Sequence, residues 1–160
     1  MKVAIGSDHA GFALKAQIIG YLEEKGYSYR DFGTMSPEPV DSADYAIPLA
    51  RAVAAGEFDR GILVCGTGIG MSILANKTPG VRCALLSDTF SAKATRRHND
   101  ANVMSLGARV TGVGLALELV EAFLGTEFSG EPRFVRRLKK LAEYENEIAH
   151  GIDGSAGEPH

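Results

Sequence analysis

Hydrophobic residues along the chain fall into two alternating kinds of segment. Short runs rich in Val, Ile and Leu predict five β-strands, over residues 2–6, 28–32, 60–66, 81–87 and 102–107. Longer segments repeat apolar residues at helical spacing and predict helices over residues 13–25, 45–55, 88–97, 112–124 and 132–150. Strands that alternate with helices are typical of an α/β protein with a parallel sheet.

The strand at residues 60–66 is expected to be buried on both faces, because Ile62, Leu63 and Val64 follow one another with no polar residue between them. Open α/β sheets bind ligands beyond the carboxyl ends of their strands. Three segments fall at such ends, namely GSDHAG, CGTGIG and SLGAR. A ligand is therefore expected to bind near these three loops.

Residues 1–150 are expected to form a single domain. The chain has 160 residues, of which 45% are hydrophobic and 23% charged, and this suits one domain that buries a substantial core. The last helix, over 132–150, is followed by no strand. The segment 151–160 is polar and rich in glycine, and we expect it to be a disordered tail.

Charge and composition exclude several partners. The 17 basic and 20 acidic residues give a net charge of −3, which offers no basic surface for nucleic acid or an anionic membrane. No apolar stretch approaches the roughly 20 residues that cross a bilayer. The opening MKVAIGSD reaches polar residues too early for a signal peptide. Both cysteines lie in apolar runs, so we expect a reduced, cytoplasmic protein.

The loop after the 60–66 strand places Cys65 before three glycines, Gly66, Gly68 and Gly70. No lysine follows them, and no full dinucleotide pattern is present, so the loop is a weak nucleotide motif. Backbone N–H groups at the start of a helix favour negative charge, and the thiolate is the reactive form of cysteine. The alternative is that Cys65 is a small core residue, which is the expected role of Cys83.

Polar side chains also stand at two other junctions. Asp8 and His9 directly follow the first strand, where they are expected to face the same crevice as Cys65, and the alternative for Asp8 is a helix N-cap. His98 and Asn99 lie between a helix and a strand, a position that suits a histidine proton carrier. The alternative for this pair is a solvated helix end.

The segment PRFVRRLKK places Arg133 and Arg137 four residues apart near the start of the last helix. One interpretation is a solvated basic face. The other is an anion site, because cations near a helix N-terminus are mildly unfavourable unless an anion joins them.

As a set, these segments resemble ribose-5-phosphate isomerase type B, within the family that also includes galactose-6-phosphate isomerase. They are GSDHAGF, RDFGT, ILVCGTGIGMSILANK, RRHNDANVMSLGARV and the R-x-x-x-R at 133 and 137, and the resemblance covers about residues 2–145. It implies a three-layer flavodoxin-like (Rossmann-like) parallel sheet of order 2-1-3-4-5 with an extra C-terminal helix. It also implies a homodimer with shared active sites, with a tetramer as the alternative, and aldose–ketose isomerisation without metal or cofactor.

The resemblance assigns the chemistry to the cysteine loop. It implies that Cys65 is the base that moves a proton between C1 and C2 of the sugar through a cis-enediolate, with the Thr67 hydroxyl assisting in the return of protons. The backbone N–H groups of Gly66, Gly68 and Gly70 would stabilise the enediolate oxygens.

The remaining residues carry substrate roles in the same resemblance. His98 would open the furanose ring with Asp8 assisting, and Asn99 would bind the reacting end of the sugar. His98, Asn99 and Arg109 would reach the pocket from the neighbouring subunit. The residues implied to hold the phosphate are His9, Arg109, Arg133 and Arg137.

Two places depart from the family pattern. Where some members carry a glutamate base, this chain has Met71, which leaves Cys65 as the base. Ser42 and Ala43 replace a tyrosine and a proline of the substrate loop, so preference among sugars is left open. The alternatives to ribose 5-phosphate are a six-carbon aldose phosphate, such as allose or galactose 6-phosphate, and a non-catalytic sugar-phosphate-binding subunit.

Overall fold

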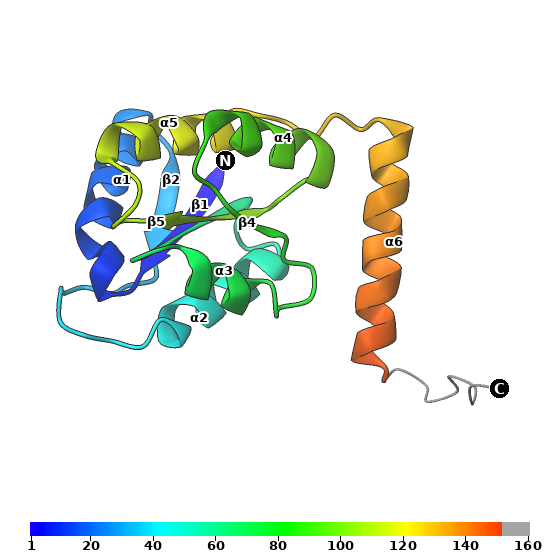
Figure 1. Cartoon of the computed structure of the whole chain (residues 1–160), viewed down its shortest axis with the longest axis horizontal. Helices are drawn as coiled ribbons and strands as arrows, with labels where there is room; N and C mark the ends of the chain where they lie inside the picture. The colour runs from blue at the N-terminus through cyan, green and yellow to red at the C-terminus, as the bar shows by residue number, and fades with distance from the viewer. Residues whose placement is uncertain (152–160) are drawn as a thin grey trace. The chain divides into compact units, whose positions relative to one another are not determined.

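The computed structural model describes residues 1–151, which belong to two compact units, Met1–Phe128 and the segment that begins at Ser129 (Figure 1). The first unit carries the sheet. The second carries one helix, α6 (Pro132–Ala149), and each unit is described by itself. The predicted tail lies outside the described residues apart from Gly151. A single domain over 1–150 stays a prediction.

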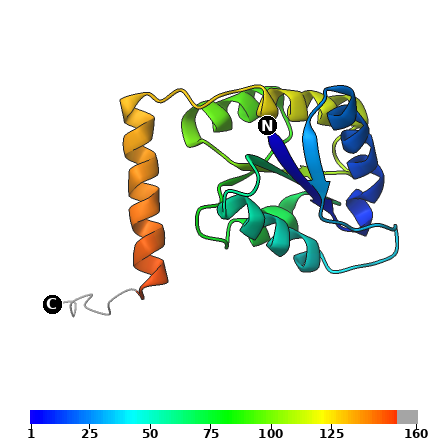
Figure 2. The same cartoon turned by 180° about the vertical axis from the view of Figure 1, so that it is seen from behind.

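The first unit is a five-stranded parallel sheet between two layers of helices, which confirms the predicted α/β fold class (Figures 1 and 2). The predicted strands and helices differ from their observed counterparts at their ends by at most two residues, whereas the short helical segments His9–Gly11 and Ile69–Ala75 were given no predicted range. The strands are β1 (Lys2–Ser7), β2 (Ser28–Asp31), β3 (Arg60–Cys65), β4 (Cys83–Leu85) and β5 (Val103–Gly107). The helical segments are η1 (His9–Gly11), α1 (Phe12–Glu24), α2 (Ala43–Ala54), α3 (Ile69–Ala75), α4 (Thr89–Asn99) and α5 (Val113–Leu124).

The strand order is β2-β1-β3-β5-β4, so the expected order 2-1-3-4-5 is wrong at one edge. β5 pairs with β3 along its whole length, from Gly61 opposite Val103 to Cys65 opposite Gly107, and all five of its residues are buried. β4 has three residues, none of them fully buried, and it pairs only with β5. A short, partly exposed strand suits a sheet edge.

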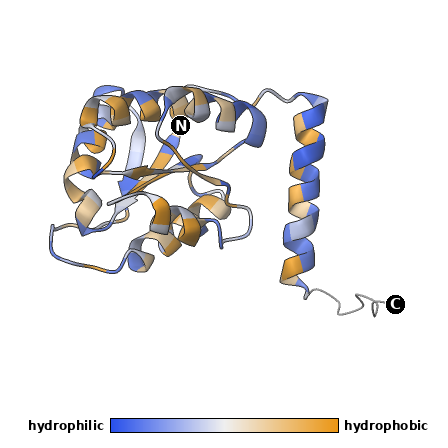
Figure 3. Cartoon of the chain, in the orientation of Figure 1, coloured by the Kyte–Doolittle hydropathy of each residue, from blue (hydrophilic) through white to orange (hydrophobic). Residues whose placement is uncertain are grey.

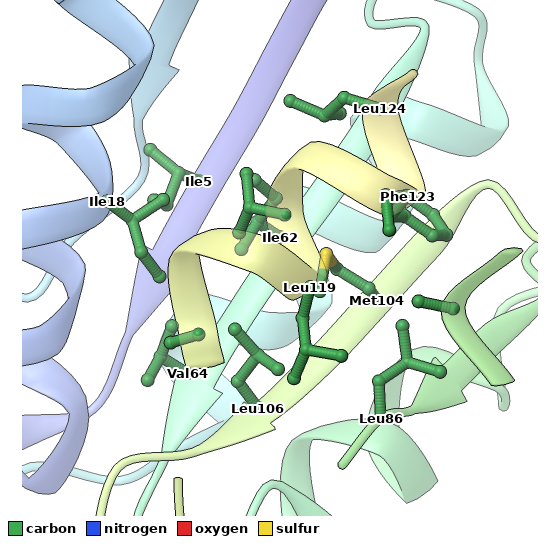
Figure 4. Packing of buried hydrophobic residues seen from close by; sticks show 14 of the residues in the cluster. Ile5, Ile18, Ile62, Val64, Leu86, Met104, Leu106, Leu119, Phe123 and Leu124 are labelled. Carbon is green, nitrogen blue, oxygen red and sulfur yellow. The ribbon is translucent and has the colours of Figure 1, made fainter. Parts of the chain in front are cut away.

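Alternating side chains of the strands pack into two separate hydrophobic cores, one on each face of the sheet. Ile62 and Val64 of β3 face α1, α4 and α5, whereas Leu63 and Cys65 face α2 and α3. Strand β3 is therefore buried on both faces, as predicted. Figure 4 shows the first core, in which Ile62 lies among side chains from the neighbouring strands and helices. Each such side chain contributes about 1.5–3 kcal/mol of burial free energy.

The distribution of hydrophobic residues along the elements agrees with this layering. In the first unit, apolar positions gather along the strands and along the sides of the helices that face the sheet (Figure 3). None of the helices among the described residues combines the length and apolar character needed to cross a membrane.

Candidate active site

The loops after β1, β3 and β5 are joined by backbone hydrogen bonds at the carboxyl edge of the sheet. The N–H of Asp8 donates to the carbonyl of Val64 at 3.2 Å. The N–H of Ala108 donates to the carbonyl of Cys65 at 2.8 Å, and that of Arg109 to the carbonyl of Gly66 at 2.9 Å. The three segments that the sequence placed at one edge therefore meet there.

Glycine is required at two points where these loops approach closely. Gly68 has φ 79°, and a Cβ on it would lie 2.5 Å from Leu85 Cδ1 and 2.9 Å from the carbonyl carbon of Leu106. A Cβ on Gly107 would lie 2.6 Å from the carbonyl oxygen of Thr67. The cysteine loop is thus packed directly onto the end of β5, and these two glycines make that contact possible.

Cys65 is the last residue of β3, and 5% of its surface is exposed. Its Sγ accepts a hydrogen bond from the N–H of Gly68 at 3.1 Å. The thiolate is the nucleophilic and basic form of cysteine. The resemblance assigned the Gly68 N–H to the sugar, but here it faces the sulfur. Thr67 is exposed beside it, and its hydroxyl oxygen accepts from the N–H of Ile69 at 3.3 Å.

Asp8 is held in one orientation by three donors. Its Oδ1 accepts from the N–H groups of Ala10 at 2.9 Å and Gly11 at 3.1 Å, so the predicted alternative of an N-cap is confirmed, on the short helix η1. Its Oδ2 accepts from the hydroxyl of Ser42 at 2.8 Å. The capping role does not exclude a second one, because the same carboxylate faces the loop that ends at Ser42.

The His9 ring is fixed by its Nδ1, which accepts from the N–H of Val40 at 3.2 Å. A neutral imidazole whose Nδ1 accepts carries its proton on Nε2. His9 therefore offers an Nε2–H donor of the kind that binds a phosphate oxygen. The segment 33–42 thus supports both polar residues of the first loop, His9 through Val40 and Asp8 through Ser42.

A buried ion pair holds the start of that segment, and the sequence analysis missed it. Lys15 is 2% exposed, and its Nζ donates to both carboxylate oxygens of Asp31, at 2.6 and 2.8 Å, and to the carbonyl of Thr34 at 2.7 Å. The Asp31 carboxylate also accepts from the N–H of Gly33 at 2.8 Å. The available signal was a lysine next to Leu14 on the buried side of helix α1.

Arg109 lies against the cysteine loop of its own chain. A Cβ on Gly66 would be 3.4 Å from Arg109 Cδ and 3.5 Å from its Nε. The loops after β3 and β5, which carry these residues, are hydrogen-bonded to each other within one chain. That Arg109 reaches the pocket of a neighbouring subunit, as the resemblance implies, stays a prediction.

His98 and Asn99 lie at the opposite edge of the sheet. Helix α4 begins after β4 and ends at Asn99, just before β5, so its last turn is at the amino ends of the strands. The carbonyl of Asn102 accepts there from Gly61, near the start of β3. At about 3.3 Å per residue, the length of β3 separates this turn from Cys65 by roughly 17 Å. The structure does not bring His98 or Asn99 to Cys65 of the same chain.

Arg133 and Arg137 belong to the second unit. Their guanidinium carbons lie over the Phe134 ring, 4.5 and 5.5 Å from its centroid, and Arg133 Nε pairs with Glu131 at 2.9 Å. Both arginines share one side of α6, as the spacing predicts. Among residues 1–151, no group of three or more His, Cys, Asp or Glu side chains is placed to hold a metal ion.

Fold and site together define the class: an α/β protein whose sheet edge gathers a hydrogen-bonded thiol, a fixed carboxylate, an imidazole and an arginine. Residues 3–141 match the model of the family described as Ribose/Galactose Isomerase, and the chain belongs to this family. The predicted resemblance is therefore confirmed. Also confirmed is the prediction of an enzyme that isomerises sugar phosphates.

Individual relatives cover nearly the whole chain. Ribose-5-phosphate isomerase B of Escherichia coli is 49% identical over 144 residues, which are 90% of this chain and 96% of the relative. D-erythrulose-4-phosphate isomerase of Pectobacterium atrosepticum is 43% identical over 154 residues, 94% of this chain and 99% of the relative. The structure of Clostridium thermocellum ribose-5-phosphate isomerase B superimposes with a TM-score of 0.90 at 47% identity, covering 92% and 99% of the two chains.

Proposed function

We propose that this enzyme interconverts ribose 5-phosphate and ribulose 5-phosphate. The observation that carries the proposal is the Cys65 sulfur at the carboxyl edge, hydrogen-bonded to the Gly68 N–H. It stands in a chain 49% identical to a ribose-5-phosphate isomerase B. Aldose–ketose isomerisation needs one base that removes and returns a proton, and such a base is what the thiolate supplies.

In the proposed reaction, the Cys65 thiolate takes the proton from C2 of the open-chain aldose. The C2–H electron pair forms the C1–C2 double bond, and the carbonyl oxygen on C1 becomes the enediolate oxygen. Return of the proton to C1 gives the ketose. The N–H groups of Gly66 and Gly70 stabilise the enediolate charge, the Gly68 N–H stays with the sulfur, and Thr67 moves the hydroxyl proton between the two oxygens.

The phosphate end of the sugar is assigned to donors around the same edge. The Nε2–H of His9 and the guanidinium of Arg109 lie on the loops that flank Cys65. Arg133 and Arg137 are proposed to complete the phosphate site. No metal or cofactor takes part in the proposed reaction, and its proposed location is the cytoplasm, where two free cysteines suit reducing conditions.

The proposed active form is a homodimer with shared sites, with a tetramer as the alternative. The position of His98 supports sharing, because one chain keeps it roughly a strand length away from its own Cys65. His98 and Asn99 of a second copy would then supply ring opening and sugar binding. Large apolar side chains are exposed around the cysteine loop, as at interfaces, and include Ile69, Ile73, Leu85 and Phe90.

The test is an isomerase assay of the purified chain with a chelator present. The aldose phosphates to compare are ribose 5-phosphate, allose 6-phosphate, galactose 6-phosphate and erythrose 4-phosphate. We expect the highest kcat/KM for ribose 5-phosphate. Binding of these compounds without any turnover would instead identify a sugar-phosphate-binding subunit, and loss of activity on chelation would contradict the metal-free reaction.

A six-carbon substrate is the second candidate, and Ser42 is the observation that favours it. Its hydroxyl contacts Asp8 at 2.8 Å, so the position that usually carries tyrosine borders the site. We expect Ser42→Tyr to raise the kcat/KM ratio of ribose 5-phosphate over allose 6-phosphate by about 10-fold, within the range that pocket contacts of this size give. A ratio unchanged within about twofold would remove Ser42 from the sugar contact.

A further inference from the structure

We propose that Arg82 is a positioning residue for His98 and Asn99, acting through the turn that ends helix α4. This inference rests on the proposed function, because it concerns how the ring-opening residue is held. Arg82 Nε donates to the carbonyls of Asn99 and Asp100, both at 3.0 Å. Its Nη2 donates to the Asp100 carbonyl at 2.8 Å and to the Asp100 carboxylate at 3.2 Å.

Arg82 donates hydrogen bonds to backbone carbonyls that have no hydrogen-bond partner within the helix. The last carbonyls of an α-helix have no partner within the helix, and cations at that end are favoured by the helix dipole. Asn99 is the last residue of α4, and Asp100 is its C-cap. One planar guanidinium therefore fixes the two peptide groups that follow Asn99, which a point charge does less well.

The turn itself has a backbone conformation that needs such support. Asp100 has φ 45° and ψ 42°, and it is the one residue other than glycine with positive φ in the described part of the chain. This left-handed conformation is sterically unfavourable for most L-residues. Residues held in such conformations persist where their surroundings fix them, and they concentrate at functional sites.

A second arginine holds the other side of Asp100, and its environment differs from that of Arg82. Arg96 Nη1 donates to Asp100 Oδ1 at 2.8 Å and to the carbonyl of Ala101 at 2.6 Å. It is 1% exposed, and its guanidinium lies 5.7 Å from the Phe123 ring centroid in the core. The Arg82 side chain is 27% exposed. Arg96 anchors the turn to the core, whereas Arg82 holds it from a partly exposed position.

The consequence for function is specific. His98 and Asn99 are consecutive residues of the last helical turn, so a rotation of the next peptide groups displaces both. A misplacement of about 1 Å at a catalytic group costs on the order of 100-fold in rate. Because His98 is assigned to ring opening, the loss should fall mainly on substrates that bind as closed rings.

The experiment compares two aldose phosphates on Arg82→Gln and Asp100→Asn. Ribose 5-phosphate closes to a furanose through O4, whereas in erythrose 4-phosphate that oxygen carries the phosphate, so no furanose forms. We expect kcat/KM for ribose 5-phosphate to fall about 10- to 100-fold, and the ratio of the two kcat/KM values to fall at least about 10-fold. His98→Asn should give the same pattern, and Arg82→Lys should recover part of it. Arg51→Gln, at an exposed position on α2, is the matched loss of one positive charge and should leave both values unchanged.

A second readout uses ribose 5-phosphate alone. Deuterium at C2 slows the proton transfer to Cys65, and this isotope effect on kcat/KM should shrink toward 1 in Arg82→Gln, because ring opening becomes limiting. A purely structural loss lowers the amount of active enzyme, reduces both substrates equally and leaves the isotope effect as in the wild type. Either that result or unchanged kinetics overturns the assignment of Arg82. Failure of the wild type to isomerise ribose 5-phosphate contradicts the proposed function instead.

Discussion

The two cysteines of this chain occupy opposite ends of parallel strands, and their surroundings differ accordingly. Cys65 ends β3, where its sulfur accepts the Gly68 N–H at 3.1 Å. Cys83 begins β4, where its thiol packs against the second core and burial raises its pKa to about 12. Both are free thiols that follow or precede apolar residues. Position along the strand, and not residue type, separates the reactive candidate from the inert one.

The direction of the strands explains the difference. At carboxyl ends, the chain turns into the first N–H groups of the following segment, which favour negative charge. At amino ends, the preceding helix presents its last carbonyls, which do not. The backbone of Cys83 is occupied by the Asn76 side chain, whose Oδ1 accepts from its N–H at 2.8 Å and whose Nδ2 donates to its carbonyl at 2.9 Å. The Cys83 thiol has a hydrogen bond with the Ser72 side chain, which lowers its pKa, but burial has the larger effect and the pKa is raised.

The largest expected effect comes from removing each thiol in turn. Cys65→Ala should lower kcat for ribose 5-phosphate by about 10²- to 10⁴-fold, the usual loss for a general base, or more. Cys83→Ala is the matched control and should stay within about threefold. Steady-state kinetics on both variants, with circular dichroism to verify folding, makes the comparison. If Cys65→Ala retained more than about a tenth of the wild-type rate, the thiol would not be the base.

The two thiols should also differ in their rates of alkylation, by a smaller factor than the two alanine variants differ in kcat. At about pH 8, a thiol with a pKa near 12 is a thiolate in roughly one molecule in 10⁴, so Cys83 should react extremely slowly with iodoacetamide. Cys65 should react at least about 100-fold faster, and ribose 5-phosphate should protect it. Peptide mass spectrometry over a time course measures both rates. Equal rates at the two positions would remove the distinction drawn from the strand ends.

A side chain at Gly68 should destabilise the protein and displace the loop that follows Cys65. Gly68→Ala forces a Cβ to 2.5 Å from Leu85 Cδ1 at φ 79°, and we expect a loss of about 1–3 kcal/mol in the free energy of unfolding. Alkylation of Cys65 should slow as its N–H donor moves away. In Gly70→Ala, the added Cβ meets no atom within 4 Å, so this variant should unfold at the same denaturant concentration as the wild type or a higher one. Equal destabilisation by the two substitutions would contradict the packing argument.

The sequence predicted the parts of this molecule that depend on local pattern. The strands and helices follow from strong hydrophobic periodicity, and the edge that carries Cys65, Asp8 and His9 follows from strand direction. The order of the last two strands did not, because β4 and β5 are both apolar and their pairing is decided by partners far along the chain.

The sequence analysis missed the residues that position the site for a similar reason. Lys15 meets Asp31 across 16 residues, and Arg82 meets Asn99 across 17. A charged side chain in the sequence gives no indication of a partner at that separation, and a solvated face is the ordinary expectation for it. The roles of single atoms are equally hidden: the Gly68 N–H was assigned to the sugar, and the fold directs it to sulfur.

The smallest effect expected from the comparison is on stability at alkaline pH. Because burial raises the pKa of the folded Cys83 thiol to about 12, the unfolded chain releases this proton at a lower pH than the folded chain does. As pH rises above about 9, ionisation therefore favours unfolding, and the free energy of unfolding should fall more steeply in the wild type than in Cys83→Ala. Below about pH 8 the thiol is protonated in both the folded and the unfolded state, so the difference between the two stabilities should be constant there and set by packing alone. Urea denaturation of both proteins at several pH values between about 7 and 10 measures the difference. A difference that stays constant over this range would show that the Cys83 thiol ionises equally in both states, and the contrast with Cys65 would then rest on the hydrogen bond from Gly68 alone.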